Sequence, residues 1–596
     1  MTVEDLRVPG AVPQGRNTTP EPGAPPEESR VAAAAAELVA SLTAEPWGQV
    51  SVSVYETGRL VSLAPWLTGH AERVRFLLAA QRPDGGWGAP GGYALVPTLA
   101  AVEALAAELG RVPGASGTPF ADEAAVGGAV RRGLAALRRW AGTEPGAGRG
   151  GDPRVPYDLR ELPDMPAVEL IVPDLLARLN GHLAALEEGE PLPPPRGMNG
   201  GKLALVRTGL AAGAAVPQKM LHALEVAAEA ASKAPGVVPT PLREGRAAAI
   251  GASPAAGAAW LGGPGEDSPV RHYLEAVVDR YAGPVPCAAP VTVFERSWTL
   301  SWLRRAGVPV TVPEELTAGL AAAIGPGGVA AGPGLPPDAD TTSVGLYTLA
   351  LLRAPREPDA LWAYETETHF CTWQGEEGAS PTVNAHVLDA FGEYLRLAGT
   401  GGRNARYAAA TGKLSAWLRG RQLPDGSWLD RWHVSPYYAT ACCALALGEY
   451  GGAESADAVR GATRWLLDTQ REDGSWGRWT GTAEETAYAL QTLLLTPAAL
   501  PATEEAPTEA TTGAATGATA GATEGATEGA AEEAVEQERR AAAVERGHRR
   551  LLTMVTGFGE PLDRPALWHD KDLYYPAAIV RAAVLGALHL ARRHRP

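Results

Sequence analysis

The amino-acid sequence predicts an all-α protein, and two observations lead to this fold class. Segments with apolar residues at positions i, i+3, i+4 and i+7 recur along the chain, for example at 71–81 and 485–495, whereas alternating strand-like runs are scarce. Three segments also share the pattern Gln-x-x-Asp-Gly-x-Trp, at 81–87, 422–428 and 470–476, and each lies between two amphipathic segments. Such an internal repeat indicates an architecture built from repeated helical hairpins.

The residue types in the repeat explain how two helices can be joined. Asp-Gly favours a tight turn. The Gln side chain can hydrogen-bond backbone groups at the end of a neighbouring helix, and the Trp ring can pack over it. We therefore interpret the three repeats as structural clamps without chemistry of their own.

Composition excludes several classes of function. The chain has 596 residues, more than one ordinary domain holds, and its net charge of −16 argues against nucleic-acid binding. The four cysteines show no CxxC spacing, which favours a reducing, cytoplasmic location. The N-terminal segment lacks the apolar core of a signal peptide, and no apolar run is long enough for a transmembrane helix. We expect a cytoplasmic protein without a transmembrane segment.

Two segments are expected to be unstructured. Residues 1–30 are rich in Pro, Gly and Glu, and residues 501–535 consist largely of Ala, Thr, Gly and Glu. Because the second lies between well-patterned helical segments, we interpret it as a surface insertion.

The three repeats resemble the QW motifs of the squalene–hopene cyclase and class II terpene cyclase superfamily. Further segments follow the order found in bacterial class II diterpene and sesquiterpene cyclases: 168–176 (VELIVPDLL), 221–225 (LHALE), 253–261 (SPAAGAAWL), 294–307 (FERSWTLSWLRRAG), 338–342 (DADTT), 384–390 (NAHVLDA) and 572–583 (DLYYPAAIVRAA). The resemblance implies a βγ didomain of two (α/α) barrels. The γ domain would cover 51–266, inserted into a β domain made of 31–50 and 267–596.

The segment DADTT supplies the expected acid. Taken alone, its residues are typical of a helix N-cap. A carboxylic acid held neutral in a dry cavity could also protonate an isolated alkene. In the family's DxDD motif the middle Asp is the acid, which corresponds to Asp340, and Asp338 matches the first Asp. Thr341 and Thr342 depart from that motif, and the resulting DxDTT is similar to the motif of halimadienyl (tuberculosinyl) and drimenyl diphosphate synthases.

The resemblance also suggests a partner for the acid. Asn384 falls where class II diphosphate cyclases carry an Asn that hydrogen-bonds the catalytic Asp. A neutral donor there would stabilise the developing carboxylate. The alternative is that Asn384 caps a helix. His386 is the squalene-type option for the partner, and we rank it below Asn384.

Carbocations are stabilised by aromatic faces. A single aromatic side chain is more often a packing residue, but the excess of Trp favours several that line a cavity. Family context singles out Trp298, Trp302, Trp373, Trp432, Tyr438, Tyr574 and Tyr575. For the final proton loss, His222 matches the His of the LHSLE-type segment in plant ent-copalyl synthases, and we expect it as a base. The Asn that completes that dyad appears as Cys287 here, which puts an ent-copalyl product in doubt.

An ionised diphosphate needs cations around it. We expect Lys571, Arg478 and Arg431 to contact it, with surface salt bridges as the alternative. Glu103 and Glu108 resemble the acidic D/E-x4-E element proposed to bind Mg²⁺ in related cyclases, with a solvated Glu pair as the alternative. The DDxxD motif of ionising terpene synthases is absent from the sequence, so the diphosphate should stay on the product.

Together these features predict an isomerase, of the intramolecular lyase type, that cyclises a linear isoprenoid diphosphate to a bicyclic diphosphate. We favour farnesyl diphosphate and a drimenyl product; the alternative is geranylgeranyl diphosphate and a halimadienyl or copalyl-type product. A squalene-type triterpene cyclase is more remote. A zinc prenyltransferase is a further rival, because Cys371 and His369 lie close together, but no matching D-x-C segment supports it. A phosphatase or a class I terpene synthase could act on the product afterwards.

Overall fold

The structure is a computed structural model that describes residues 27–594, except 112–119, 121, 144–154, 187–189, 233, 235, 243–244, 265–266, 497–520 and 558. The predicted unstructured segments at 1–30 and 501–535 fall mostly outside the described residues. Where they are described they are helical, since one helix begins at Glu27 and another at Gly521. Both stretches are rich in Ala and Glu, which favour helix.

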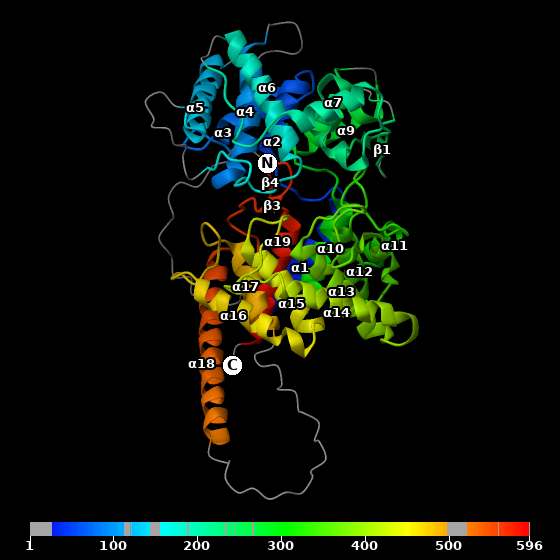
Figure 1. Ribbon diagram of the computed structural model, residues 1–596, viewed down its shortest axis with the longest axis vertical. Helices are drawn as coiled ribbons and strands as arrows, with labels where there is room; N and C mark the ends of the chain where they lie inside the picture. The colour runs from blue at the N-terminus through cyan, green and yellow to red at the C-terminus, as the bar shows by residue number, and fades with distance from the viewer. Residues whose placement is uncertain are drawn as a thin grey trace, which may run out of the picture.

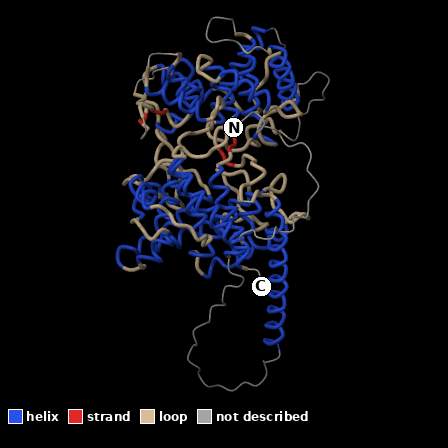
Figure 2. Tube along the Cα trace, turned by 180° about the vertical axis from the view of Figure 1, so that it is seen from behind, coloured by secondary structure: helices blue, strands red, loops and turns tan. Residues whose placement is uncertain are grey.

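The described chain forms two helical lobes, with the short strands β3 and β4 between them (Figures 1 and 2). This arrangement agrees with the predicted all-α class. The upper lobe contains α2 (Val54–Leu63), α3 (His70–Ala79), η2 (Gly91–Ala94), α4 (Leu95–Leu109), α5 (Glu123–Ala141), α6 (Val168–Leu186), α7 (Gly201–Ala211), η3 (Gln218–Ala231), β1 (Thr240–Pro241), β2 (Ala248–Ala249), α8 (Pro254–Leu261) and α9 (Pro269–Arg280). The remaining elements are α1 (Glu27–Ala44), α10 (Thr292–Arg305), α11 (Glu314–Ala323), α12 (Ala339–Leu351), η4 (Pro358–Tyr364), α13 (Pro381–Ala398), η5 (Gly402–Asn404), α14 (Ala405–Arg419), α15 (Pro436–Tyr450), η6 (Ala453–Ser455), α16 (Ala456–Thr469), α17 (Ala483–Leu495), α18 (Gly521–Thr553), β3 (Trp568–His569), β4 (Leu573–Tyr574) and α19 (Ala577–Arg593).

Each lobe is a closed ring of helices. In the lower lobe α10, α12, α13, α15, α17 and α19 pack in sequence, and α19 packs back on α10. An outer layer of α1, α11, η4, α14, α16 and α18 covers this ring, each between two inner neighbours. In the upper lobe α2, α4, α6, η3 and α8 close a smaller ring, with α3, α5, α7 and α9 outside. These rings are the two (α/α) barrels that the resemblance implied.

The boundary between the lobes differs from the expected one at residue 266. Helix α9 packs on α8, and its apolar residues, including Tyr273, belong to an upper-lobe core that continues to Ala289. The lower-lobe core includes Cys287 and then continues through α10. The expected limits of the other segments stay predictions.

The repeats act as the predicted clamps between helices. Gln470 Nε2 donates to the carbonyl of Gly474 and, across to α18, to that of Ala543, both at 2.9 Å. The indole N–H of Trp476 donates to the Leu466 carbonyl at the end of α16 at 2.8 Å. The same bonds recur at Gln81 with Trp87 and at Gln422 with Trp428. The Trp bonds satisfy carbonyl groups in the last turn of the preceding helix, and the Gln bonds reach a carbonyl of the next outer helix.

One apolar stretch, Gly91–Leu109, has the length and composition of a membrane-spanning helix. Most of it is buried inside the upper lobe, where it supplies an inner helix of the ring. It is therefore accounted for as a core helix.

Candidate active site

A cavity of about 520 Å³ lies where the two lobes meet. This volume is typical of sites for small-molecule ligands. The upper lobe contributes the start of α6 and part of η3. The lower lobe contributes the start of α12 and the β3–β4 hairpin. Both aspartates of the DADTT segment line this cavity.

The two aspartates at the start of α12 have different roles. Asp338 is the N-cap: its Oδ1 accepts a hydrogen bond from the Thr341 N–H at 2.6 Å and its Oδ2 one from the Thr341 hydroxyl at 3.0 Å. Burial, together with the nearby charge of Asp340, raises the pKa of Asp338 to about 7. The structure thus gives Asp338 the capping role, and its expected part in catalysis stays a prediction. Asp340, in the first turn, keeps its carboxyl group for other contacts.

The partner of Asp340 is His386 of α13. Nδ1 of His386 lies 2.6 Å from Oδ1 of Asp340. Burial alone would lower the pKa of His386, but the charge of Asp340 raises it well above the usual range. A protonated imidazole at this distance donates a charge-assisted hydrogen bond to the acid. It can stabilise the carboxylate that remains after Asp340 gives up a proton.

The expected contact between Asn384 and Asp340 is corrected by the structure. The side chain of Asn384 instead accepts a hydrogen bond from the Phe370 N–H at 2.8 Å and donates to the carbonyls of Phe370 and Ser380 at 3.0 and 2.9 Å. Positions two apart on a helix face different sides, so only one of Asn384 and His386 can meet the acid. Asn384 fastens the loop before α13 to that helix.

Aromatic rings cover much of the cavity wall. Of the predicted aromatic residues, Trp373, Trp432 and Tyr574 line it. Phe294 and Trp568 also line it and were missed, although Phe294 begins the FERSWTLSW segment. The rings of Trp373 and Trp432 meet edge to face with centroids 5.3 Å apart.

The other predicted aromatics lie behind this wall. The indole N–H of Trp298 donates to the Tyr438 hydroxyl at 2.9 Å, and the Trp298 ring packs edge-on against His386. Trp302 packs on Tyr488, with ring centroids 5.2 Å apart. Tyr575 is buried beside the cavity-lining Tyr574. Trp298 and Tyr438 therefore orient His386 rather than face the cavity.

His222 lines the cavity but has no free nitrogen. Its Nδ1 lies 2.7 Å from the Gly251 carbonyl, and its Nε2 lies 2.7 Å from Oδ1 of Asp570. Burial opposes the protonated imidazole, yet the charge of Asp570 raises the pKa of His222 above its usual value. With both nitrogens protonated, His222 has no lone pair to accept another proton. This corrects the expectation that His222 itself is the base.

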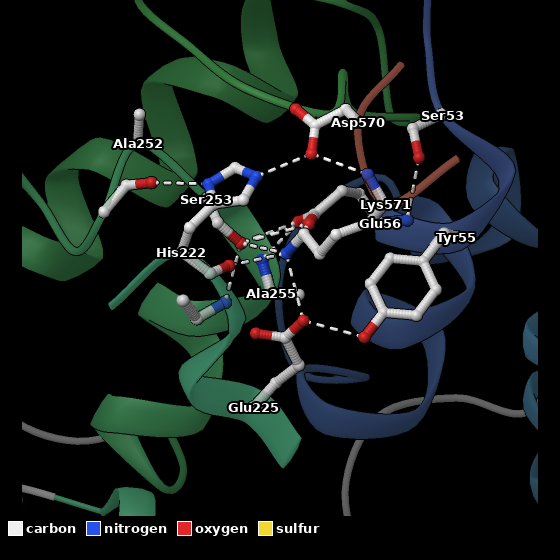
Figure 3. Close-up of polar contacts among 12 residues, drawn as sticks. Ser53, Tyr55, Glu56, His222, Glu225, Ala252, Ser253, Ala255, Asp570 and Lys571 are labelled. Carbon is white, nitrogen blue, oxygen red and sulfur yellow. Dashed lines mark hydrogen bonds and ion pairs between the residues drawn. The ribbon is translucent and has the colours of Figure 1, made fainter. Parts of the chain in front are cut away.

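Lys571 is also placed differently from expectation. It is fully buried, and its Nζ forms ion pairs with Glu56 and with Glu225, the latter at 3.0 Å. It donates as well to the Ser253 hydroxyl at 2.9 Å and to the His222 carbonyl at 2.7 Å (Figure 3). Lys571 still lines the cavity, but two carboxylates share its charge and it joins the lobes, so its contact with a diphosphate stays a prediction.

The two expected arginines have unequal positions. Arg478 donates to the Val434 carbonyl at 2.5 Å, lies over the rings of Tyr93 and Trp479, and does not line the cavity. Arg431 does line it, in an ion pair with Asp164 at 3.2 Å.

Two lysines that were missed from sequence also line the cavity. Nζ of Lys219 lies 2.6 Å from Glu376, and Lys202 pairs with Glu169. Both lysine side chains remain more than half exposed. Together with Arg431 they form a group of cations in the cavity wall that an anionic group could reach.

Glu103 and Glu108 do not form the expected Mg²⁺ site. Glu103 is paired with the buried Arg59 at 2.7 Å and with His182 at 3.3 Å. Glu108 is paired with His70 and Arg111 at 3.0 and 2.8 Å. Neither lines the cavity, and the described part of the chain holds no group of three or more His, Cys, Asp or Glu that could bind a metal ion. Cationic side chains occupy the carboxylates that a metal would need.

Comparison with known proteins places this geometry in a family. Residues 378–500 match the squalene-hopene cyclase C-terminal domain. An ent-copalyl diphosphate synthase from Streptomyces sp. (strain KO-3988) is 38% identical, covering 94% of this chain and 96% of its own. The chain belongs to the class II terpene cyclases. A labda-7,13-dienyl diphosphate synthase from Streptomyces clavuligerus is also 38% identical, over 96% of this chain and 95% of its own. The solved ent-copalyl diphosphate synthase of Streptomyces platensis has a TM-score of 0.79 and 38% identity, covering 95% of this chain and 100% of its own.

The pKa of Asp338 gives this class II cyclase an expected pH dependence. Asp338 is neutral below about pH 7 and negative above it. A negative charge beside Asp340 opposes the carboxylate that forms when Asp340 gives up its proton, so the turnover rate should fall as the pH rises through about 7. Asp338→Asn keeps the cap and is always neutral, so it should lose this decline. A pH–rate profile that is the same in both proteins would contradict the expectation.

Because Glu103 pairs with Arg59, we expect that replacing Glu103 lowers the stability of the fold without changing the requirement for Mg²⁺. Glu103→Gln leaves the buried Arg59 without its counter-charge, which should lower the free energy of unfolding by about 3 kcal/mol. Denaturant titration measures this loss. Glu72→Gln, in an exposed ion pair with Arg75, is the matched control and should change stability little. A folded Glu103→Gln enzyme that needs more Mg²⁺ for activity would restore the metal-site hypothesis.

Proposed function

We propose that this cyclase converts geranylgeranyl diphosphate to a bicyclic, copalyl- or labdadienyl-type diphosphate and leaves the diphosphate on the product. Asp340 would protonate the distal double bond. The supporting observation is the 38% identity, over nearly the whole chain, to synthases named for copalyl and labdadienyl diphosphates. Asp340 in the cavity wall, paired with His386, supplies the acid that such a reaction needs.

Farnesyl diphosphate, the substrate favoured from sequence, is the less well supported choice. That preference depended on Cys287 replacing one member of a base dyad. A base decides which proton leaves the final cation, whereas substrate length depends on the space between the acid and the diphosphate. The replacement therefore carries no argument for the shorter chain, and the named relatives favour the longer one.

The residues divide the proposed reaction between two parts of one cavity. Asp340 starts the reaction, and the rings of Trp373, Trp432 and Tyr574 offer π faces to the cations that follow. The diphosphate would lie near Lys202, Lys219 and Arg431. We propose that Mg²⁺ arrives with the diphosphate, because Glu103 and Glu108 are held in ion pairs. A phosphatase or a class I terpene synthase would act on the retained diphosphate.

The test is to incubate the purified enzyme with Mg²⁺ and either geranylgeranyl or farnesyl diphosphate, then to dephosphorylate the products for gas chromatography–mass spectrometry. A bicyclic C20 alcohol from geranylgeranyl diphosphate alone is the expected result. A bicyclic C15 alcohol from farnesyl diphosphate alone would support the drimenyl alternative. Linear alcohols from both would overturn the proposal and make squalene the next substrate to try.

A further inference from the structure

The β3–β4 hairpin of the lower lobe inserts its tip into the upper lobe. Asp572 accepts hydrogen bonds from the Ser53 hydroxyl at 2.7 Å and from the Tyr55 N–H at 2.9 Å. The ion pairs of Lys571 with Glu56 and Glu225 fasten the same tip (Figure 3). The two side chains that follow Asp570 are thus held by the upper lobe, so the tip has little freedom to move.

Asp570, at this tip, is presented to the cavity as a carboxylate. Its Oδ1 accepts hydrogen bonds from His222 Nε2 at 2.7 Å and from the Lys571 N–H at 2.6 Å. The second oxygen points away from both donors in Figure 3. The side chain lines the cavity and is 14% exposed. Burial would favour the neutral acid, but His222 and Lys571 lower the pKa of Asp570.

Asp340, the acid that starts the reaction, and Asp570 face the same cavity. Both line the cavity, as does Tyr574. Burial, with contributions from Asp570 and Asp340, raises the pKa of the Tyr574 phenol, which therefore lies within electrostatic reach of both carboxyl groups. A substrate folded in this cavity would have one carboxyl group available at its start and another for its end.

Three other groups near Asp570 in the cavity wall are poorly suited to accept a proton. Both nitrogens of His222 are already engaged. Nδ1 of His569 contacts the Arg431 carbonyl, and burial lowers the pKa of His569 to about 3, so its second nitrogen is a weak base. Burial and nearby carboxylates raise the pKa of the Cys287 thiol, which stays neutral. Asp570, by contrast, is a carboxylate whose Oδ2 accepts neither the His222 nor the Lys571 hydrogen bond.

We propose that Asp570 accepts the proton that ends the cyclisation and that His222 is its positioning residue. The inference rests on the proposed function. In this step a C–H bond next to the final cation breaks, its electron pair becomes the new double bond, and the proton moves to Oδ2 of Asp570, the oxygen that accepts neither the His222 nor the Lys571 hydrogen bond. Asp570 then releases that proton to solvent and Asp340 regains one, so the overall reaction is an isomerisation.

The test compares Asp570→Asn with Asp572→Asn, its matched control in the same hairpin. Asp572 binds Ser53 and Tyr55 and does not line the cavity, so its replacement tests structural damage alone. In Asp570→Asn we expect the wild-type product to form about 100-fold more slowly while substrate is still consumed. Hydroxylated bicyclic diphosphates and double-bond isomers should replace it. Asp572→Asn should keep the wild-type product, whatever its rate.

An unchanged product distribution in Asp570→Asn would overturn the inference. If that variant does not fold, Asp570→Glu keeps the charge but moves the carboxylate, so a shifted set of double-bond isomers supports the inference and an unshifted set overturns it. Failure of the proposed function is recognised separately, since the wild-type enzyme would then make no bicyclic C20 diphosphate at all.

Discussion

Asp340→Asn is expected to lower the rate of cyclisation by about 10⁴-fold, to the limit of detection. The amide has nearly the size of the acid and can still accept the hydrogen bond from Nδ1 of His386, but it has no acidic proton for an alkene. The measurement is single-turnover conversion of geranylgeranyl diphosphate, followed by gas chromatography–mass spectrometry of the dephosphorylated product.

The fold of this variant should be intact. Asp338, not Asp340, caps α12, so the helix keeps its N-terminal hydrogen bonds. Thermal unfolding should therefore match the wild type closely. Asp338→Asn is the control, because it places the same amide two residues earlier and should still cyclise the substrate. An Asp340→Asn enzyme that kept a tenth or more of the wild-type rate would show that another group is the acid.

The fold was largely predictable because its signals are local. Each Gln-x-x-Asp-Gly-x-Trp repeat carries its own turn and its own hydrogen-bonding side chains, and the structure uses all three in the expected way. Helical periodicity likewise depends on residues within a few turns of each other. The lobe boundary was missed because α9 could pack on either side, and only contacts with α8 decide its place.

The site was predictable only where a motif names a residue. Asp338 and Asp340 line the cavity as the DADTT segment suggested. The position of the Lys571 side chain depends on its ion pairs with Glu56 and Glu225, which are hundreds of residues away and in the other lobe. No periodicity encodes such a contact, so the sequence could not show that Lys571 pairs with two carboxylates of the other lobe.

The interpretation of Glu103 failed for the same reason. Its spacing from Glu108 suggested a metal, but Arg59 on another helix takes its carboxylate. For the acid's partner, Asn384 and His386 are two residues apart on one helix, and sequence alone does not give the rotation of that helix. Asp570 lies beside Lys571 in the same HDKDLYYP stretch. The signal that singles it out is its contact with the cavity-lining His222, which the structure shows.

His386→Ala should lower the turnover rate by about 100- to 1000-fold, with little change in KM. The imidazole lies 2.6 Å from Asp340, and the charge of the Asp340 carboxylate raises the pKa of His386, so a positively charged imidazole is favoured as the acid gives up its proton. The imidazole stabilises the carboxylate that forms as the proton leaves. This negative charge develops in the transition state and is absent when the substrate is only bound. The loss should therefore appear in kcat.

Asn384→Ala separates this role from a structural one. That change removes the hydrogen bonds to Phe370 and Ser380, so it should lower thermal stability while the folded enzyme keeps a kcat close to the wild-type value. If the two variants exchanged these effects, with kcat lost in Asn384→Ala and retained in His386→Ala, Asn384 would be the partner of the acid after all. A rotation of α13 on substrate binding would then be required, because in this structure the face that meets Asp340 carries His386.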